Sequence, residues 1–151
     1  MASYFEFTEI STAWAAVSIS GVTVKAASAM PSEVSARDCP MLAPAPNYIS
    51  GLTVEAMSLG APDQMRATCT YNMTYRYYHA PVGATRGLLD IYTGLLDKVD
   101  LIMSTAFDNS NLTDSIEFWP AGATAPTVVS DPAGNQFYGC DLTFSVITFV
   151  R

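Results

Sequence analysis

The clearest hydrophobic pattern in the chain lies between Ala84 and Phe107. Its apolar side chains recur at spacings of three and four residues, which is the period of one face of an α-helix. The residues of this face are Leu88, Ile91, Tyr92, Leu95, Val99, Ile102 and Ala106. The pattern therefore predicts a long amphipathic helix, with its core-facing side defined by these positions.

Three further apolar residues, Leu89, Leu96 and Met103, follow at seven-residue intervals and widen this face. The resulting band is broader than a single sheet needs to cover, so we expect a second covering from a neighbouring chain. We interpret the three residues as candidates for a subunit contact. The alternative is that they are buried in their own chain.

Two segments alternate between apolar and polar residues, as strands that cover a core on one face do. Met65–Tyr78 is the first, and it enters the helix through a predicted turn at His79–Gly83. Its inward-facing residues are Ala67, Cys69, Tyr71, Met73, Tyr75 and Tyr77. Gln136–Val150 is the second, with Leu142, Phe144, Val146 and Thr148 on one face.

The remaining elements are shorter. Phe5–Ile19 has apolar residues at helical spacing, with Gly21 as a plausible stop. Val22–Ala27, Tyr48–Leu59 and Asp114–Trp119 are predicted strands. The chain is therefore expected to be one α+β domain over residues 1–151. We predict a mixed, mostly antiparallel sheet of four to five strands, packed on one face by a long central helix and an N-terminal helix.

Two stretches lack periodicity. Residues 30–47 contain four prolines among small residues and predict a loop, which is longer than compact domains usually carry. Residues 120–135 predict an irregular arm that ends in a tight turn, Asp131–Asn135. The loop is either a surface excursion or an arm that reaches a neighbouring subunit. In the second interpretation its candidate contact residues are Pro40, Pro44 and Pro46.

Composition supports assembly. Half of the residues are hydrophobic and 14% are charged, whereas about 25% are charged in typical soluble proteins. A domain of 151 residues cannot bury half of its side chains internally. We therefore expect part of the apolar surface to be buried against other subunits.

Charge and cysteine content narrow the function classes. The net charge is −7, and the Lys and Arg residues form no cluster. These features disfavour tight nucleic-acid binding, but they allow DNA to pass along an acidic surface. Three scattered cysteines favour a reducing compartment. The sequence has neither an apolar run of about 18 residues nor the features of a signal peptide. We expect no membrane association and a cytosolic location where the protein is made.

The search for catalytic groups returns no specific signal. His79 is the single histidine, and we interpret it as structural. We interpret Cys69 and Cys140 as buried small side chains. Gly83–Gly87 lacks the ending of a phosphate-binding loop, so Thr85 is interpreted as a helix cap.

Other candidate groups are equally unspecific. Asp108, Asp114 and Asp131 lack the spacing of a calcium loop. Tyr75–Tyr78 mixes aromatic rings with Arg76 and could stack bases, but core or interface packing explains it better. The carboxylates Glu6, Glu9 and Glu55 would form an acid and base pair if the fold brought them together. We predict no catalytic residue, no cofactor and no metal site, and hence a protein that is not an enzyme.

The order of elements resembles the tail-terminator and tail-completion (neck) proteins of long-tailed bacteriophages. The segments that carry the resemblance are the strand ATCTYNMTYRYY, the helix GLLDIYTGLLDKVDLIM and the closing strand FYGCDLTFSVITF. Residues 30–47 depart from the more compact members of this family.

The resemblance implies a ring, commonly of six subunits, at the head-proximal end of the tail tube. Such a ring ends tube polymerisation and joins the tail to the neck, while DNA passes through its lumen. The implied partners are further copies of the chain, the tail tube protein and the head-to-tail connector or neck proteins. The implied location is the virion tail or neck, and the host cytoplasm during assembly.

Three alternatives stay open at this point. One is a head-completion or minor tail protein. Another is a small ligand-binding domain or enzyme with a curved sheet, in which Tyr71, Tyr75 and Tyr77 line a pocket. The third is an accessory factor that binds a host protein through Ser32–Pro46.

Overall fold

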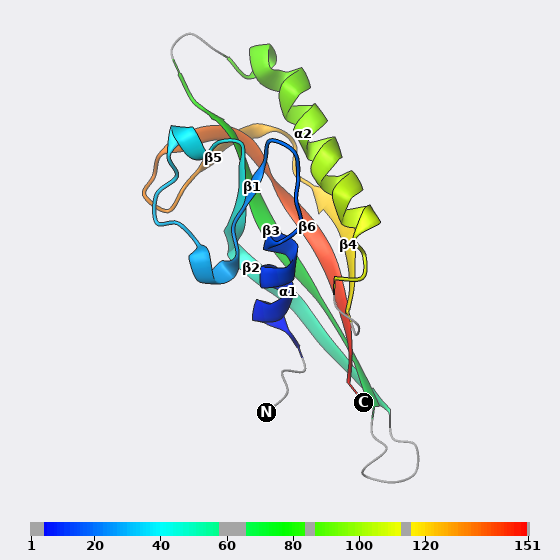
Figure 1. The fold of residues 1–151 in the computed structure, drawn as a ribbon. Coiled ribbons are helices and arrows are strands. Elements are labelled where there is room, and N and C mark those ends of the chain that lie inside the picture. Colours follow the sequence, from blue (N-terminus) through cyan, green and yellow to red (C-terminus); the bar gives the residue numbers. More distant parts are fainter. Residues whose placement is uncertain (1–4, 58–65, 84–86, 113–115, 151) are drawn as a thin grey trace.

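The computed structural model describes residues 5–57, 66–83, 87–112 and 116–150, and Figure 1 shows their arrangement. The helices are α1 (Phe7–Ala15) and α2 (Leu88–Asp108), with two short 3-10 turns, η1 (Ala27–Ala29) and η2 (Ala36–Asp38). The strands are β1 (Thr23–Val24), β2 (Met41–Met57), β3 (Arg66–Pro81), β4 (Ile116–Ala123), β5 (Thr127–Ser130) and β6 (Gln136–Val150). The chain is therefore α+β, as its hydrophobic patterns predict.

Within the described residues, six strands form one mixed sheet in the order β1-β2-β3-β6-β4, and β5 pairs with β6. β1 runs parallel to β2, and every other pair is antiparallel. The prediction of four to five strands is wrong, because the sheet also contains β5. This strand lies in the segment that was expected to be an irregular arm. The two long strands predicted from alternation, β3 and β6, are neighbours at the centre of the sheet.

Both helices pack on the same face of this sheet and share one core cluster with it. The predicted alternation of β3 and β6 is confirmed, because the side chains assigned to the inner face are buried except that of Ala67, which is partly exposed. Trp14 of α1 lies against Phe118 and Phe144, with ring centroids 5.0 and 5.5 Å away. These two rings stack on each other at 4.8 Å. Aromatic burial of this extent is a large part of the folding free energy in a domain of this size.

Helix α2 buries a narrower face than the sequence predicts. Ile91, Leu95, Ile102 and Ala106 are buried as expected, but 38% of Tyr92 is exposed. The helix also runs beside β4, the edge strand, rather than over the middle of the sheet, which α1 covers (Figure 1). The central position predicted for this helix is therefore not confirmed.

The ends of the helices and turns also shift. α1 ends at Ala15, so Gly21 does not stop it but lies in the following turn with φ of 73°. β3 continues through the predicted turn as far as Pro81. Residues 84–86, including the predicted cap Thr85, lie outside the described residues. Residues 58–65, which include the end of the predicted strand Tyr48–Leu59, lie outside them as well.

The prediction that residues 30–47 form a loop is wrong from Met41 onward, where β2 begins. The carbonyl groups of Pro40 and Leu42 accept hydrogen bonds from the β1 segment at 3.0 and 2.8 Å, so they point to the sheet edge. Pro44 shares this alternation, so the N–H group that it lacks would face the edge, where no ladder bond is lost. Pro46 lies in the irregularity between Pro44 and Ile49. The prolines are therefore compatible with a strand of this kind.

The arm predicted at residues 120–135 is also largely strand. β4 extends to Ala123 and β5 pairs with the start of β6. The predicted turn at Asp131–Asn135 is confirmed: the Gly134 N–H donates to the Asp131 carbonyl at 3.0 Å, and Gly134 has φ of 90°. Glycine adopts this left-handed conformation without the strain that a side chain would cause.

A second, smaller cluster lies on the opposite face at one end of the sheet. Its buried residues are Val34, Met41, Ala43, Tyr78, Val129 and Phe137. The segment before β2 thus folds over the outer face instead of extending away from the domain. This packing fixes the part of the predicted loop that contains η2.

The tight contact of β6 with β3 gives a direct test of the central pairing. A methyl group at Gly139 would collide with the Tyr77 carbonyl oxygen and lie 3.2 Å from Cγ2 of Val129. We expect Gly139→Ala to lower the free energy of unfolding by about 2 kcal/mol, the typical cost of overpacking. Urea denaturation followed by circular dichroism measures this loss. Gly122→Ala is the control, because a methyl group there meets no atom within 4 Å; equal losses for both variants would contradict the pairing.

Candidate interaction surface

The exposed flank of α2 carries two of the three helix residues that the sequence marks as a subunit contact. Leu89 is 88% exposed and Leu96 is 41% exposed. Met103 is instead partly buried against the core, as the alternative interpretation holds. Tyr92 and Phe107 lie on the same side of the helix and are 38% and 59% exposed. We call Leu89, Tyr92, Leu96 and Phe107 the α2 stripe.

The stripe continues onto the edge of the sheet. The Phe107 ring makes an edge-to-face contact with Trp119 of β4, with centroids 5.9 Å apart, and 36% of Trp119 is exposed. Ring pairs of this kind are typical of protein interfaces, because they offer a large apolar area at little conformational cost. Sequence analysis missed this pair, since the two residues are distant along the chain.

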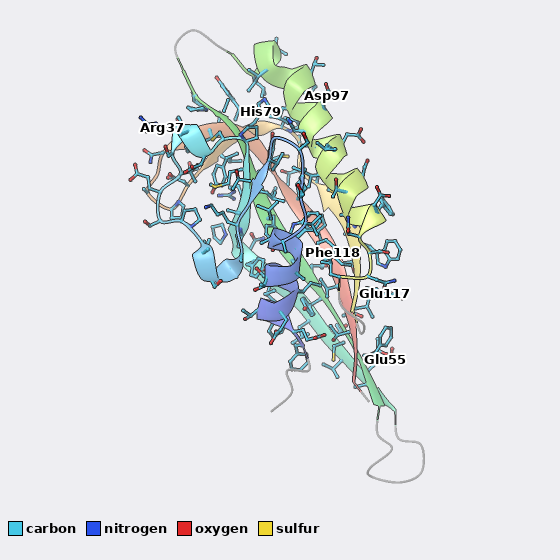
Figure 2. All side chains as sticks on the ribbon, viewed as in Figure 1. Arg37, Glu55, His79, Asp97, Glu117 and Phe118 are labelled. Atoms are coloured by element: carbon cyan, nitrogen blue, oxygen red, sulfur yellow. The ribbon has the colours of Figure 1, made fainter. Side chains whose placement is uncertain are left out.

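Carboxylates lie beside the stripe. Asp97 and Asp100 are exposed on α2, and Figure 2 shows Asp97 on the side of the helix that faces away from the sheet. Lys98, the basic residue between them, donates from Nζ to the Ser20 carbonyl at 3.0 Å. The Lys98 ammonium group is thus hydrogen-bonded to the turn after α1. The surface beside the stripe is therefore acidic.

The three candidate prolines differ in environment. Pro40 is half-buried, Pro44 is buried and Pro46 is exposed. Pro44 is therefore covered within its own chain, whereas Pro46 is accessible on β2. The part of residues 30–47 that does not form a strand packs on the outer face of the sheet.

A buried carboxylate holds that segment in place. Asp131, 5% exposed, accepts hydrogen bonds from the Val34 N–H at 2.8 Å, the Asn135 N–H at 2.8 Å and the Asn135 side-chain amide at 3.0 Å. Burial by itself would raise the pKa of the carboxyl group, but these hydrogen bonds outweigh burial and lower the pKa below 3.8. Asp131 thus ties residue 34 to the turn between β5 and β6. The sequence indicates the turn but not this long-range bond.

A surface pocket, which we call the hollow, lies beside the hydrogen bond between Asp131 and Val34. The hollow has a volume of about 850 Å³ and lies between η2, the end of β3 and the turn before β6. Its apolar lining includes Ala36, Pro81, Val82 and Phe137, and its polar lining includes Ser35 and Asn135. The side chain of Val82 is 38% exposed there. Nothing in the sequence pattern predicts this hollow, because tertiary packing of the loop creates it.

Arg76, which could stack with bases according to the sequence, forms an ion pair with Asp141. Its Nε and Nη2 donate to the two carboxylate oxygens of Asp141 at 2.8 and 3.1 Å, and its Nη1 donates to the Ser130 carbonyl at 3.1 Å. The hydrogen bond to Asp141 raises the pKa of the guanidinium. Arg76 therefore links β3 to β6 and to the end of β5 on the outer face.

The tyrosines proposed to line a ligand pocket pack into the core. Tyr71, Tyr75 and Tyr77 are fully buried, and each hydroxyl has a partner. The partners are the Phe5 carbonyl at 2.7 Å, the Tyr48 hydroxyl at 3.2 Å and Nδ1 of His79 at 2.7 Å. Burial raises the pKa of all three phenols. They therefore act as core residues, which removes the support that the ligand-binding alternative drew from them.

Other candidate chemical groups are dispersed. Cys69 and Cys140 are buried, which confirms their interpretation, and burial raises the pKa of Cys140 to about 11. Burial, with a smaller contribution from Lys98, lowers the pKa of His79. Glu6 and Glu9 belong to the α1 side of the sheet, whereas Glu55 lies far along β2 (Figure 2).

The part of the chain that the structure describes contains no group of three or more side chains placed to hold a metal ion. Its helices are also too short or too polar to cross a membrane.

No protein-family model matches the sequence, and comparison with curated proteins finds no significant match. Any functional conclusion must therefore come from the surface itself and from the order of elements.

The Asp131 tie predicts a specific pH dependence. Because its pKa is lowered in the folded state, Asp131 stabilises the fold above pH 4 or so, and this contribution is lost as the pH falls through the folded pKa. We expect Asp131→Asn to lower the free energy of unfolding at pH 7 by about 1–3 kcal/mol. The difference from the unaltered protein should shrink as the pH falls through the folded pKa of Asp131. Urea denaturation across this range measures it. Asp38→Asn, at an exposed carboxylate, is the matched control, and a pH-independent difference would contradict the assignment.

Proposed function

We propose that the chain is a structural subunit of a ring at the head-proximal end of a bacteriophage tail tube. In this role the ring ends tube polymerisation and joins the tail to the neck or connector proteins. The chain acts through contact with further copies of itself and with those partners. Catalysis has no part in the proposal.

The observation that carries the proposal is the α2 stripe with its Phe107–Trp119 ring pair. Four large apolar side chains exposed along one helix are costly for a monomer in water, since burying such area contributes about 25 cal/mol per Å². A composition with 50% hydrophobic and 14% charged residues adds to this argument. A neighbouring subunit would remove the stripe from water.

The order of elements supports the phage assignment more specifically. The resemblance rests on a long strand that enters a helix and on a closing strand, and β3, α2 and β6 occupy these places. A net charge of −7 suits a ring through which DNA passes, because an acidic surface repels phosphate. A hexamer is the ring size that the resemblance implies.

The proposal is tested by assembly. The purified protein should form a closed ring in negative-stain images, with a central hole wide enough for duplex DNA. It should also cap tubes made from the tail tube protein of the same phage. A protein that stays monomeric even when that tube protein is present contradicts the proposal, and binding to head proteins alone favours the head-completion alternative.

A single substitution tests whether Leu96 of α2 belongs to a subunit contact or to the core. We expect Leu96→Glu to leave the fold intact, because Leu96 is 41% exposed, but to weaken each subunit contact by about 2 kcal/mol, or roughly 30-fold. Mass photometry measures assembly, and circular dichroism measures the fold. Ile102→Glu is the matched control on the same helix. Ile102 is fully buried, so that variant should unfold. Unfolding of both variants would assign Leu96 to the core.

A further inference from the structure

We propose that the α2 stripe docks onto the hollow beside η2 of a second copy of the chain, and that Asp100 of one copy pairs with Arg37 of the next. This inference rests on the proposed ring and names the two surfaces that form its subunit contact. Leu96 is the residue that enters the hollow.

The strand edges are unsuited to this contact. At the β2 edge, Pro44 and Pro46 lack donors, and irregularities interrupt the strand between Pro44 and Ile49 and between Ser50 and Thr53. At the other edge, the Phe118 N–H of β4 already donates to the Ser110 carbonyl at 2.9 Å. Prolines and bulges are features that prevent edge-to-edge pairing of strands. Copies of the chain are therefore expected to associate through side-chain surfaces and not through strand edges.

The two surfaces have complementary shapes. The α2 stripe is convex, since it is the flank of a helix, and Leu89, Tyr92 and Leu96 project from it. The hollow is concave, and Ala36, Pro81 and Val82 provide apolar contacts for an inserted side chain. A volume of about 850 Å³ is large enough for more than one such side chain.

Their charges are complementary as well. Asp100 lies one turn after Leu96 on the same side of α2 and is exposed. Arg37 directly follows Ala36, which lines the hollow. Among the cationic side chains whose exposure the structure describes, Arg37 is the exposed one.

Two carboxylates near Arg37 face local groups. Glu33 lines the hollow, and its carboxylate accepts a hydrogen bond from the side-chain amide of Asn135 at 3.2 Å. Asp38 acts on the neighbouring Cys39 thiol, whose pKa is raised to about 11, chiefly by burial and further by this carboxylate. Arg37 is therefore the charge most available to an incoming partner.

The positions of the surfaces favour a ring over a two-fold dimer. Figure 2 shows Arg37 and Asp97 on opposite sides of the molecule. Two different surfaces on opposite sides produce head-to-tail contacts, which close into a ring when the rotation between copies permits. A two-fold dimer would instead bring one surface against itself.

A charge exchange in the full chain tests the pairing. Arg37→Glu and Asp100→Arg each place like charges at every contact, so each should weaken assembly by at least about tenfold in the apparent dissociation constant. The double variant restores opposite charges across each contact, because both residues come from different copies. We expect it to assemble within about threefold of the unaltered protein. Sedimentation velocity measures these constants, and unchanged urea midpoints confirm that all variants fold.

Glu55→Arg is the net-charge control for Asp100→Arg, because it also replaces a carboxylate with a guanidinium but lies far from both surfaces (Figure 2). Its assembly should match that of the unaltered protein. If the unaltered protein forms rings but the single variants assemble normally, or the double variant is not restored, the pairing is wrong and the proposed ring stands. If the unaltered protein does not assemble, even with the tube protein, both proposals fail.

Discussion

The structure depends on the antiparallel pairing of β3 with β6. Paired residues run from Ala67 opposite Val150 to Pro81 opposite Phe137, with one irregularity near the β6 start. Because side chains alternate along a strand, this pairing places the aromatic and aliphatic residues of both strands on one face. The two helices then cover that face, which β4 extends at the sheet edge. The bidentate pair of Arg76 and Asp141 fixes the same register on the other face.

One consequence of this arrangement is unequal covering. α1 lies over the middle of the inner face, where Trp14 contacts Phe118 and Phe144. α2 is displaced toward β4 and turns only part of its apolar circumference inward. The rest of that circumference has no covering within the described chain. Part of the excess of hydrophobic residues therefore lies on α2 and at Trp119, and other exposed apolar residues, Leu52, Val54 and Phe149, lie on β2 and β6.

Periodicity predicted the elements that bury one face. β6 was predicted with its observed bounds, and the inner residues of β3 were identified from alternation. Predictions failed where local propensity and tertiary context disagree. Pro44 and Pro46 suggest a loop, but their place at a sheet edge allows a strand. The exposure of Leu89 and Leu96 followed from the width of the apolar band. The hollow and the Asp131 tie join residues about 100 positions apart, which no local pattern reveals.

The same geometry limits how the molecule can associate. Its long strands could have offered extended edges, but prolines and bulges interrupt β2, and Ser110 occupies part of β4. The outer face is closed at one end by residues 30–40, held through Asp131. The remaining exposed surfaces include the apolar flank of α2 and the hollow next to η2, besides Leu52, Val54 and Phe149 on β2 and β6. The α2 flank and the hollow are unlike surfaces that cannot cover each other within one copy. In the ring that we propose, they meet from copy to copy.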